Sequence, residues 1–173
     1  MTDPTVLPLE IQPVTADLLA PYGKLVTPTE DGVPYGPTDA ILELDRGTPR
    51  FYIMRLHHRP LLVAQITRHV DVTQCLATTS GRPWIIVVAP PGDTRDTTAL
   101  PDPERIRAFL VPGGCIVALH RGTWHAGPYF HGETEDFFNL ELADTNITDH
   151  HTVRLDTVFG RIFTLGTGGA PNA

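Results

Sequence analysis

Lysine is almost missing from this chain of 173 residues: Lys24 is the only one, and arginine supplies the rest of the 13 basic residues. They are outnumbered by 20 acidic residues, which leaves a formal net charge of -7 at pH 7. A chain this acidic opposes a phosphate backbone or an anionic membrane surface rather than attracting it. We therefore expect neither a nucleic acid nor a membrane as partner.

Cysteine and long apolar runs are also scarce. Cys75 and Cys115 stand in no metal-binding or redox spacing, and both lie in apolar runs where a free thiol packs as a small hydrophobic group. No stretch approaches the roughly 20 apolar residues that span a bilayer. The start, MTDPTVLPLE, has neither the basic nor the apolar region of a secretory signal. These absences predict a soluble, cytoplasmic protein.

Glycine and proline, by contrast, are abundant, with 15 and 17 residues. So many chain breakers exclude long helices, and from residue 51 onward the sequence consists of short β-prone runs separated by turns such as Pro112-Gly113-Gly114. The predicted strands are 51–56, 61–67, 72–78, 84–90, 107–111, 115–120 and 136–142. Strands that recur every 8 to 12 residues or so are typical of an all-β sandwich or barrel.

Helices are expected at two short places only. Thr15 can cap a helix over 16–20, and Asp102 can cap a turn that has Pro103 at its first position. We predict an N-terminal arm over 1–50 that packs on a barrel over 51–165. A flexible tail is predicted for 166–173, which is rich in glycine.

Histidine is the residue type that points to chemistry, and three of the eight stand among polar neighbours in the motifs RHVDVTQ and HRGTWH. If 67–71 is extended, His69 and Asp71 share a face. Inward polar groups of a small barrel line a concave site, so we predict a cluster of His69, Gln74, His120 and His125. The five other histidines are interpreted as structural, exposed or in polar loops: His57, His58, His131, His150 and His151.

The stretch 68–149 resembles the ureidoglycolate lyase family of cupins, formerly called ureidoglycolate hydrolases. The landmarks that carry the resemblance are Arg68-His69 followed by Thr73-Gln74, WIIVVAP, IRAFL, HRGTWH, and DFF at 136–138. The resemblance implies an all-β fold, the double-stranded β-helix barrel of cupins, and a homodimer. It also implies a carbon-nitrogen lyase of allantoin and purine breakdown that releases urea and glyoxylate from ureidoglycolate.

This reaction needs a general base, a general acid and a cation for the substrate carboxylate. Histidine fills the first two roles near neutral pH, so we assign them to His69, His120 and His125, with Gln74 as an orienting amide. Candidate substrate-binding residues are three arginines suited to bidentate contacts and one tryptophan for the pocket wall: Arg55, Arg68, Arg121 and Trp124.

Cupins usually bind a divalent ion, and the resemblance points to nickel. His69, Gln74 and His125 stand near the positions of such ligands, with glutamine where a carboxylate is usual. The chain also departs from the family pattern at Val70 and Ala126, and at Leu142 where the family tends to carry arginine. These departures leave the exact substrate open.

Two further hypotheses fit the same histidines. One is a metal-dependent cupin with another small-molecule activity, such as an isomerase or a dioxygenase. The other is a cupin that binds a small ligand without transforming it.

Overall fold

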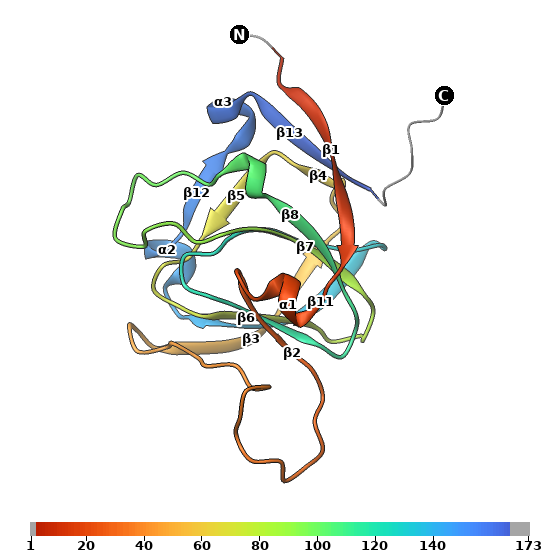
Figure 1. Ribbon diagram of the computed structural model, residues 1–173, viewed down its shortest axis with the longest axis vertical. Coiled ribbons are helices and arrows are strands. Elements are labelled where there is room, and N and C mark those ends of the chain that lie inside the picture. Colours follow the sequence, from red (N-terminus) through yellow and green to blue (C-terminus); the bar gives the residue numbers. More distant parts are fainter. Residues whose placement is uncertain (1–2, 167–173) are drawn as a thin grey trace.

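The computed structural model describes residues 3–166, and two β-sheets make up most of this part of the chain. The predicted tail therefore lies outside the described residues except for Gly166. The larger sheet has the strand order β12-β5-β10-β7-β8-β1-β13-β4 and the smaller one the order β2-β9-β6-β11-β3 (Figure 1). The two sheets face each other and curl, as in a cupin barrel.

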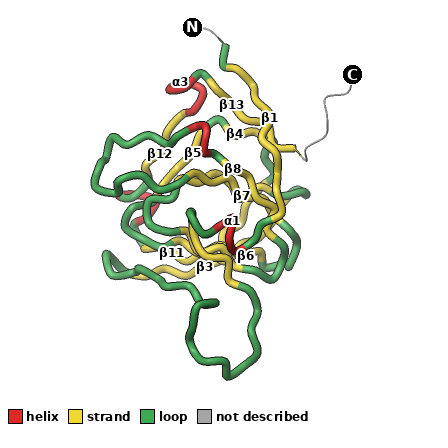
Figure 2. Tube along the Cα trace, viewed as in Figure 1, coloured by secondary structure: helices red, strands yellow, loops and turns green. Residues whose placement is uncertain are grey.

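The strands of the larger sheet come from both ends of the chain and from its middle. They are β1 (Thr5–Pro13), β4 (Leu62–Val63), β5 (Gln65–Arg68), β7 (Trp84–Ala89), β8 (Arg107–Val111), β10 (Trp124–Tyr129), β12 (His151–Arg154) and β13 (Arg161–Gly166). The smaller sheet contains β2 (Gly23–Val26), β3 (Pro49–His57), β6 (Gln74–Thr78), β9 (Ile116–Leu119) and β11 (Thr134–Leu142). Figure 2 shows that the long connection between β2 and β3 forms a loop that extends beyond the two sheets. Its later residues return to the barrel, where the carbonyl oxygen of Glu43 accepts from the N–H of Thr73 at 3.1 Å.

The helices are short, as the glycine and proline content predicts. They are α1 (Ala16–Leu19), the 3-10 turn η1 (Pro103–Arg105), α2 (Thr145–Thr148) and α3 (Leu155–Phe159). Both predicted caps are confirmed: the hydroxyl of Thr15 accepts from the N–H of Leu18 at 3.2 Å, and the carboxylate of Asp102 accepts from the N–H of Glu104 at 3.0 Å. No helix of residues 3–166 is long and apolar enough to cross a membrane.

Strand β7 shows why the run WIIVVAP is apolar throughout. Trp84, Ile86 and Val88 point into the core between the two sheets, whereas Ile85 and Val87 point into a second core on the other face of the larger sheet. A strand that is covered on both faces needs no polar positions. The second core is closed by side chains from β4, β5, β13 and α3, including those of Val63, Ile66, Phe163 and Leu155.

The N-terminal strand β1 was not predicted, because its prolines argue against a strand inside a sheet. It pairs in parallel with β13 over 5–10 and with β8 over 11–13. Each residue of β1 therefore has a strand neighbour on one side only. Proline has no backbone N–H to donate. Pro8 and Pro13 are tolerated because their backbone nitrogens point to the side of β1 that has no strand neighbour at these positions.

The all-β fold class is confirmed, and every predicted strand overlaps an observed one, whereas β2, β10, β12 and β13, like β1, were not predicted. Within the predicted strands the differences are local: the run 61–67 is divided into β4 and β5 at Ala64, and the strand predicted over 72–78 begins only at Gln74. His151 was assigned to a polar loop, which is wrong, since it begins β12. Strand β5 ends at Arg68, so the extended segment assumed for 67–71 does not form.

The predicted turn Pro112-Gly113-Gly114 touches the β6–β7 connection at Gly81. A Cβ atom added to Gly113 would lie 1.6 Å from the backbone oxygen of Gly81, so no side chain fits at this position. The glycine in Pro112-Gly113-Gly114 thus permits the close approach of the β6–β7 and β8–β9 connections.

Candidate active site

A cavity of about 520 Å³ lies between the two sheets, beside the apolar core. Its walls come from β3, β6 and β11 on one side and from β5 and β10 on the other, with Asn146 of α2, His150 and Arg154 at the end of β12 near its mouth. The lining is rich in histidine, amide, tyrosine and arginine side chains: Tyr52, Arg59, Gln65, His69, Gln74, His125, Tyr129, Asn139, Glu141, Asn146, His150 and Arg154. This volume is within the usual range for small-molecule sites, roughly 300 to 1,000 Å³.

His69 and His125 lie side by side in this cavity, with 5.1 Å between their ring centroids. The Nδ1 of His69 is 2.5 Å from the carbonyl oxygen of Asp149, and the Nδ1 of His125 is 3.2 Å from that of Thr123. A carbonyl oxygen only accepts hydrogen bonds, so each neutral ring carries its proton on Nδ1. The Nε2 atoms are left with lone pairs that can take a proton or bind a metal ion.

Burial keeps both rings neutral at pH 7. His69 is 6% exposed and His125 8%. Desolvation lowers the pKa of His125 to about 3, with a smaller contribution from the neighbouring His69. Desolvation also lowers the pKa of His69, against the opposing effect of its hydrogen bond to Asp149. The pair therefore provides two bases rather than two cations.

The floor of the cavity is a polar network around Glu141, whose side chain is 1% exposed. Its carboxylate accepts hydrogen bonds from Asn139 at 3.0 Å, Asn146 at 3.1 Å, and Gln74 and Tyr52 at 3.3 Å each. Since burial of a carboxylate is unfavourable without partners, these four donors explain how it is tolerated there. Burial raises the pKa of Tyr52, and the charge of Glu141 adds to this effect, so the phenol stays a donor.

Two arginines line the cavity near its mouth. Arg59 donates to the carbonyl oxygen of Pro128 at 2.9 Å, and its guanidinium carbon lies 5.0 Å from the centre of the Tyr129 ring. Arg154 is held by Asp156, which accepts from its Nε at 3.0 Å. Because Arg59 has no carboxylate partner within residues 3–166, its charge is free to meet an anion.

The structure brings together three of the four residues predicted to be catalytic: His69, Gln74 and His125 all line the cavity. It places the fourth elsewhere. His120 follows β9 on the outside of the barrel, where its ring is exposed and its Nε2 lies 3.3 Å from the carbonyl oxygen of Ala20. The motif HRGTWH was interpreted as supplying two histidines to one site. The chain turns at Gly122, so that His120 lies on the outside of the barrel and His125 in the cavity.

None of the four predicted substrate-binding residues lines the cavity. Arg55 is exposed and pairs with Asp136 at 2.8 Å. Arg68 is fully buried and donates to the carbonyl oxygens of Asp93 and Asp96 in the loop after β7.

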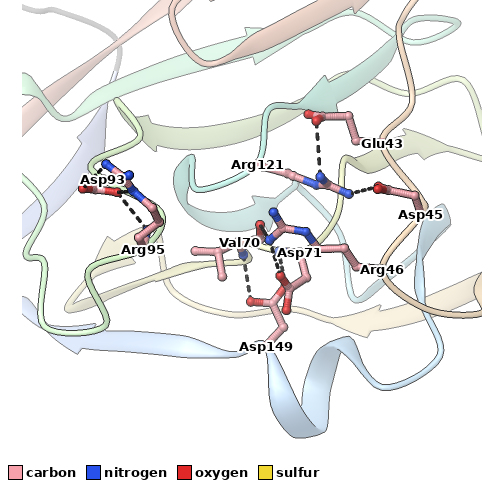
Figure 3. A network of polar contacts seen from close by, with 9 residues as sticks. All are labelled: Glu43, Asp45, Arg46, Val70, Asp71, Asp93, Arg95, Arg121 and Asp149. Carbon is pink, nitrogen blue, oxygen red and sulfur yellow. Dashed lines mark hydrogen bonds and ion pairs between the residues drawn. The ribbon is translucent and has the colours of Figure 1, made fainter.

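The other two are engaged as well. Arg121 is held between Glu43, at 3.3 Å, and Asp45, at 2.5 Å, as Figure 3 shows. Trp124 points into the second core, where its ring packs against the guanidinium of Arg68 at 4.8 Å. It precedes His125 in β10, and neighbouring residues of a strand point to opposite faces.

Several cavity residues escaped the sequence analysis. Asn139 and Glu141 lie on the same face of β11 as Phe137, and the other face also carries apolar residues, so the alternation alone did not identify them. His150 was interpreted as part of a solvated loop, yet its ring lies 5.6 Å from that of His69. No sequence pattern marked His150, because α2 brings it back toward the cavity.

The cavity has donors for a metal ion, although no three His, Cys, Asp or Glu side chains of residues 3–166 come together as a metal centre. Gln74 has a buried Oε1 without a hydrogen-bond partner among these residues. Together with the Nε2 atoms of His69 and His125 it provides neutral nitrogen and oxygen ligands, which suit a divalent transition metal ion. The predicted ligand set thus fits such an ion.

Comparison with known proteins agrees with this arrangement. Residues 6–158 match the family model described as ureidoglycolate lyase. A ureidoglycolate lyase of Azotobacter vinelandii is 32% identical over 68% of this chain and 74% of its own length. Proteins of the same name from Pseudomonas syringae pv. tomato and Burkholderia mallei are 30% and 31% identical, over 83% and 77% of this chain and 88% and 81% of their own lengths.

Proposed function

The chain belongs to the ureidoglycolate lyase family, and we propose that it splits ureidoglycolate into glyoxylate and urea in the cavity between its two sheets. The observation that carries this proposal is the pair of buried neutral histidines, His69 and His125, beside a floor of amide side chains. A small substrate with one carboxylate, one hydroxyl and one ureido group finds a chemical partner for each. A cytoplasmic location, in purine breakdown, is part of the same proposal.

The reaction transfers one proton and breaks one bond. A base removes the proton of the hydroxyl group, the oxygen forms the aldehyde of glyoxylate, and the carbon–nitrogen bond breaks. The departing urea nitrogen takes up a proton, so the atoms balance without another reactant. We assign the base to the Nε2 of His69 or His125, and the imidazolium that forms is the acid that returns the proton to urea.

The carboxylate of the substrate requires a cation at the mouth of the cavity. In place of the three arginines expected from the sequence we propose Arg59, whose guanidinium still has free N–H donors beside its bond to Pro128. Arg154 lines the same opening. The ureido group would meet the amides of Gln74 and Asn139 on the floor, which match its donors and acceptor.

A divalent metal ion, nickel by family resemblance, would be held by His69, His125 and the Oε1 of Gln74. Because the ion would occupy the same Nε2 lone pairs, this arrangement is an alternative to the one in which either ring acts as the base. Such an ion supplies Lewis acidity, which makes a bound hydroxyl group easier to deprotonate. The second ring nitrogens of both histidines are already bonded to backbone carbonyls, and this is the usual support for a metal-binding histidine.

Turnover of ureidoglycolate is the test of this function. We expect the purified protein to release glyoxylate, followed as its hydrazone, well above the spontaneous rate. The assay is run on protein treated with a chelator and on the same protein after addition of Ni²⁺, which separates the catalytic proposal from the metal proposal. Release at the spontaneous rate in both samples would contradict the assigned substrate.

We also propose that the chain forms a homodimer through the outer face of β3 and β11. This face carries large exposed apolar side chains: Phe51 is 68% exposed, Ile53 58% and Phe138 40%, and the two phenylalanine rings stack with 5.9 Å between their centroids. A patch of this kind commonly marks a contact with another protein. Strand β3 is also an edge strand of the smaller sheet.

Light scattering at micromolar concentration tests the dimer. The wild-type protein is expected to have twice the mass of one chain, and Ile53→Lys is expected to yield the single-chain mass, because a charge in the apolar contact opposes association. Val158→Lys is the matched control, since Val158 is also exposed, at 47%, but lies on α3 away from β3 (Figure 1). A wild-type monomer, or a dimer that survives the change at Ile53, would contradict this interface.

A further inference from the structure

His69 stands just outside the sheet. Strand β5 ends at Arg68, and residues 69–73 belong to no strand or helix, so no strand pairing fixes the position of the imidazole. One backbone contact, from the N–H of Gly122 to the carbonyl oxygen of His69 at 2.6 Å, holds the main chain. The orientation of the ring must therefore come from another element.

Asp149, which follows α2, supplies three contacts to this segment. Its Oδ1 accepts from the N–H of Val70 at 2.7 Å, and its Oδ2 accepts from the N–H of Asp71 at 2.8 Å (Figure 3). Its backbone oxygen accepts from the Nδ1 of His69. The residue is 2% exposed, so water does not compete effectively for these bonds.

These contacts have a chemical consequence for His69. The carboxylate fixes the two residues after the histidine, while the carbonyl of the same residue selects the ring tautomer with its proton on Nδ1. The carboxylate contacts and the carbonyl contact come from the same residue. If the carboxylate of Asp149 moves, its backbone carbonyl therefore moves relative to the ring of His69 as well. The lone pair of Nε2 is thereby directed away from Asp149.

We propose that Asp149 is the positioning residue that fixes the orientation and the tautomer of His69. This inference rests on the proposed role of His69 in the lyase reaction. Asp149 does not touch the substrate. It acts through the backbone and ring of the histidine, as a carboxylate that orients a catalytic imidazole does in other enzymes, here with the backbone carbonyl making the ring contact.

The test is Asp149→Asn, which keeps the size of the side chain. In the wild type both carboxylate oxygens accept from backbone N–H groups, those of Val70 and Asp71. In the variant one of these oxygens is replaced by an N–H₂ group, which cannot accept that hydrogen bond. We expect kcat to fall about 10- to 100-fold with little change in KM, because binding groups stay in place. In nitrogen NMR spectra of chelator-treated protein, the ring of His69 is expected to change from the single Nδ1–H tautomer to a mixture. Asp71→Asn is the matched control, since that carboxylate is partly exposed, pairs with Arg46 at 2.6 Å and does not contact His69.

An unchanged tautomer and an unchanged kcat in Asp149→Asn would overturn the inference. The spectra need no substrate, so they decide it even if the protein fails to turn over ureidoglycolate, and the two failures remain distinct. Hydrogen exchange on the wild-type protein gives a measurement independent of any variant. The amides of Val70 and Asp71 are expected to exchange slowly although they lie outside the strands, and fast exchange of both would overturn the role assigned to the carboxylate.

Discussion

Replacement of His69 by asparagine is expected to lower kcat/KM for ureidoglycolate by roughly 10²- to 10⁴-fold. Asparagine can keep a hydrogen bond to the carbonyl of Asp149, but it has no basic nitrogen to take the proton of the substrate hydroxyl. The ring of His69 is the one that contacts both His125, at 5.1 Å, and His150, at 5.6 Å, so it lies at the centre of the histidines in the cavity. The measurement is steady-state release of glyoxylate.

The control for this variant is His58→Asn, because His58 is an exposed residue of the β3–β4 connection and is not among the residues that line the cavity. We expect its kcat/KM to equal that of the wild type. Circular dichroism and urea unfolding show whether either variant is folded. If folded His69→Asn retained activity within threefold of the wild type, the proton would be removed by another group, and His125 would be the next candidate.

A second large effect is expected on stability at low pH. The pKa of His125 is lowered to about 3 in the folded protein and that of His69 is lowered as well, in both cases chiefly through desolvation. Below about pH 6.5 the unfolded chain therefore binds a proton on His125 while the folded protein does not, until the pH approaches 3. Stability falls as the pH falls, by about 1.4 kcal/mol per pH unit for His125, and the lowered pKa of His69 acts in the same direction. Between about pH 6.5 and about pH 4.5, the lowered pKa of His125 alone reduces the free energy of unfolding by about 3 kcal/mol.

Urea unfolding of chelator-treated protein between pH 7 and pH 4.5 or so measures this loss. The matched variant is His125→Gln, which is neutral at every pH. Its free energy of unfolding is expected to depend less steeply on pH than that of the wild type, by up to about 1.4 kcal/mol per unit. Equal pH dependence of the two proteins would mean that folding does not lower the pKa of His125.

The central strands β7, β8 and β9 were predictable because turn residues mark their ends. Pro83 and Pro90 bound β7, and the turn Pro112-Gly113-Gly114 separates β8 from β9. Strand β1 could not be predicted in this way, because residues 5–10 pair with β13, which lies more than 150 residues further along the chain. Local propensity carries no information about such a partner, and here the long-range pairing outweighs the prolines.

The candidate site was only partly predictable for a related reason. His69 and Gln74 stand at the end of one strand and the start of the next, and His125 belongs to β10, so the motifs located them. In β11, both alternating sets of DFFNLEL contain apolar residues, so the pattern does not say which face is inward. The network of Glu141 therefore stayed hidden until Tyr52 of β3 was paired with Asn139 of β11.

The arginines illustrate the opposite error. Arg68 and Arg121 are direct neighbours of cavity or barrel residues in the sequence, and this made them natural candidates. Each is instead neutralised or bonded by groups from distant loops, Arg68 by the carbonyls of Asp93 and Asp96, and Arg121 by Glu43 and Asp45. Arg59 is left without a carboxylate among residues 3–166 and lines the mouth.

The parallel pairing of β1 with β13 affects how the protein is made. Residues 5–10 are synthesised more than 150 residues before residues 161–166, which are their only strand partners. The edge of β1 that pairs with β13 therefore stays open until residues 161–166 have been made. Contacts of such long sequence separation form slowly. We therefore expect the pairing of β1 with β13 to form late in folding, and until then the second core lacks the side chains that β13 contributes, Phe163 and Leu165.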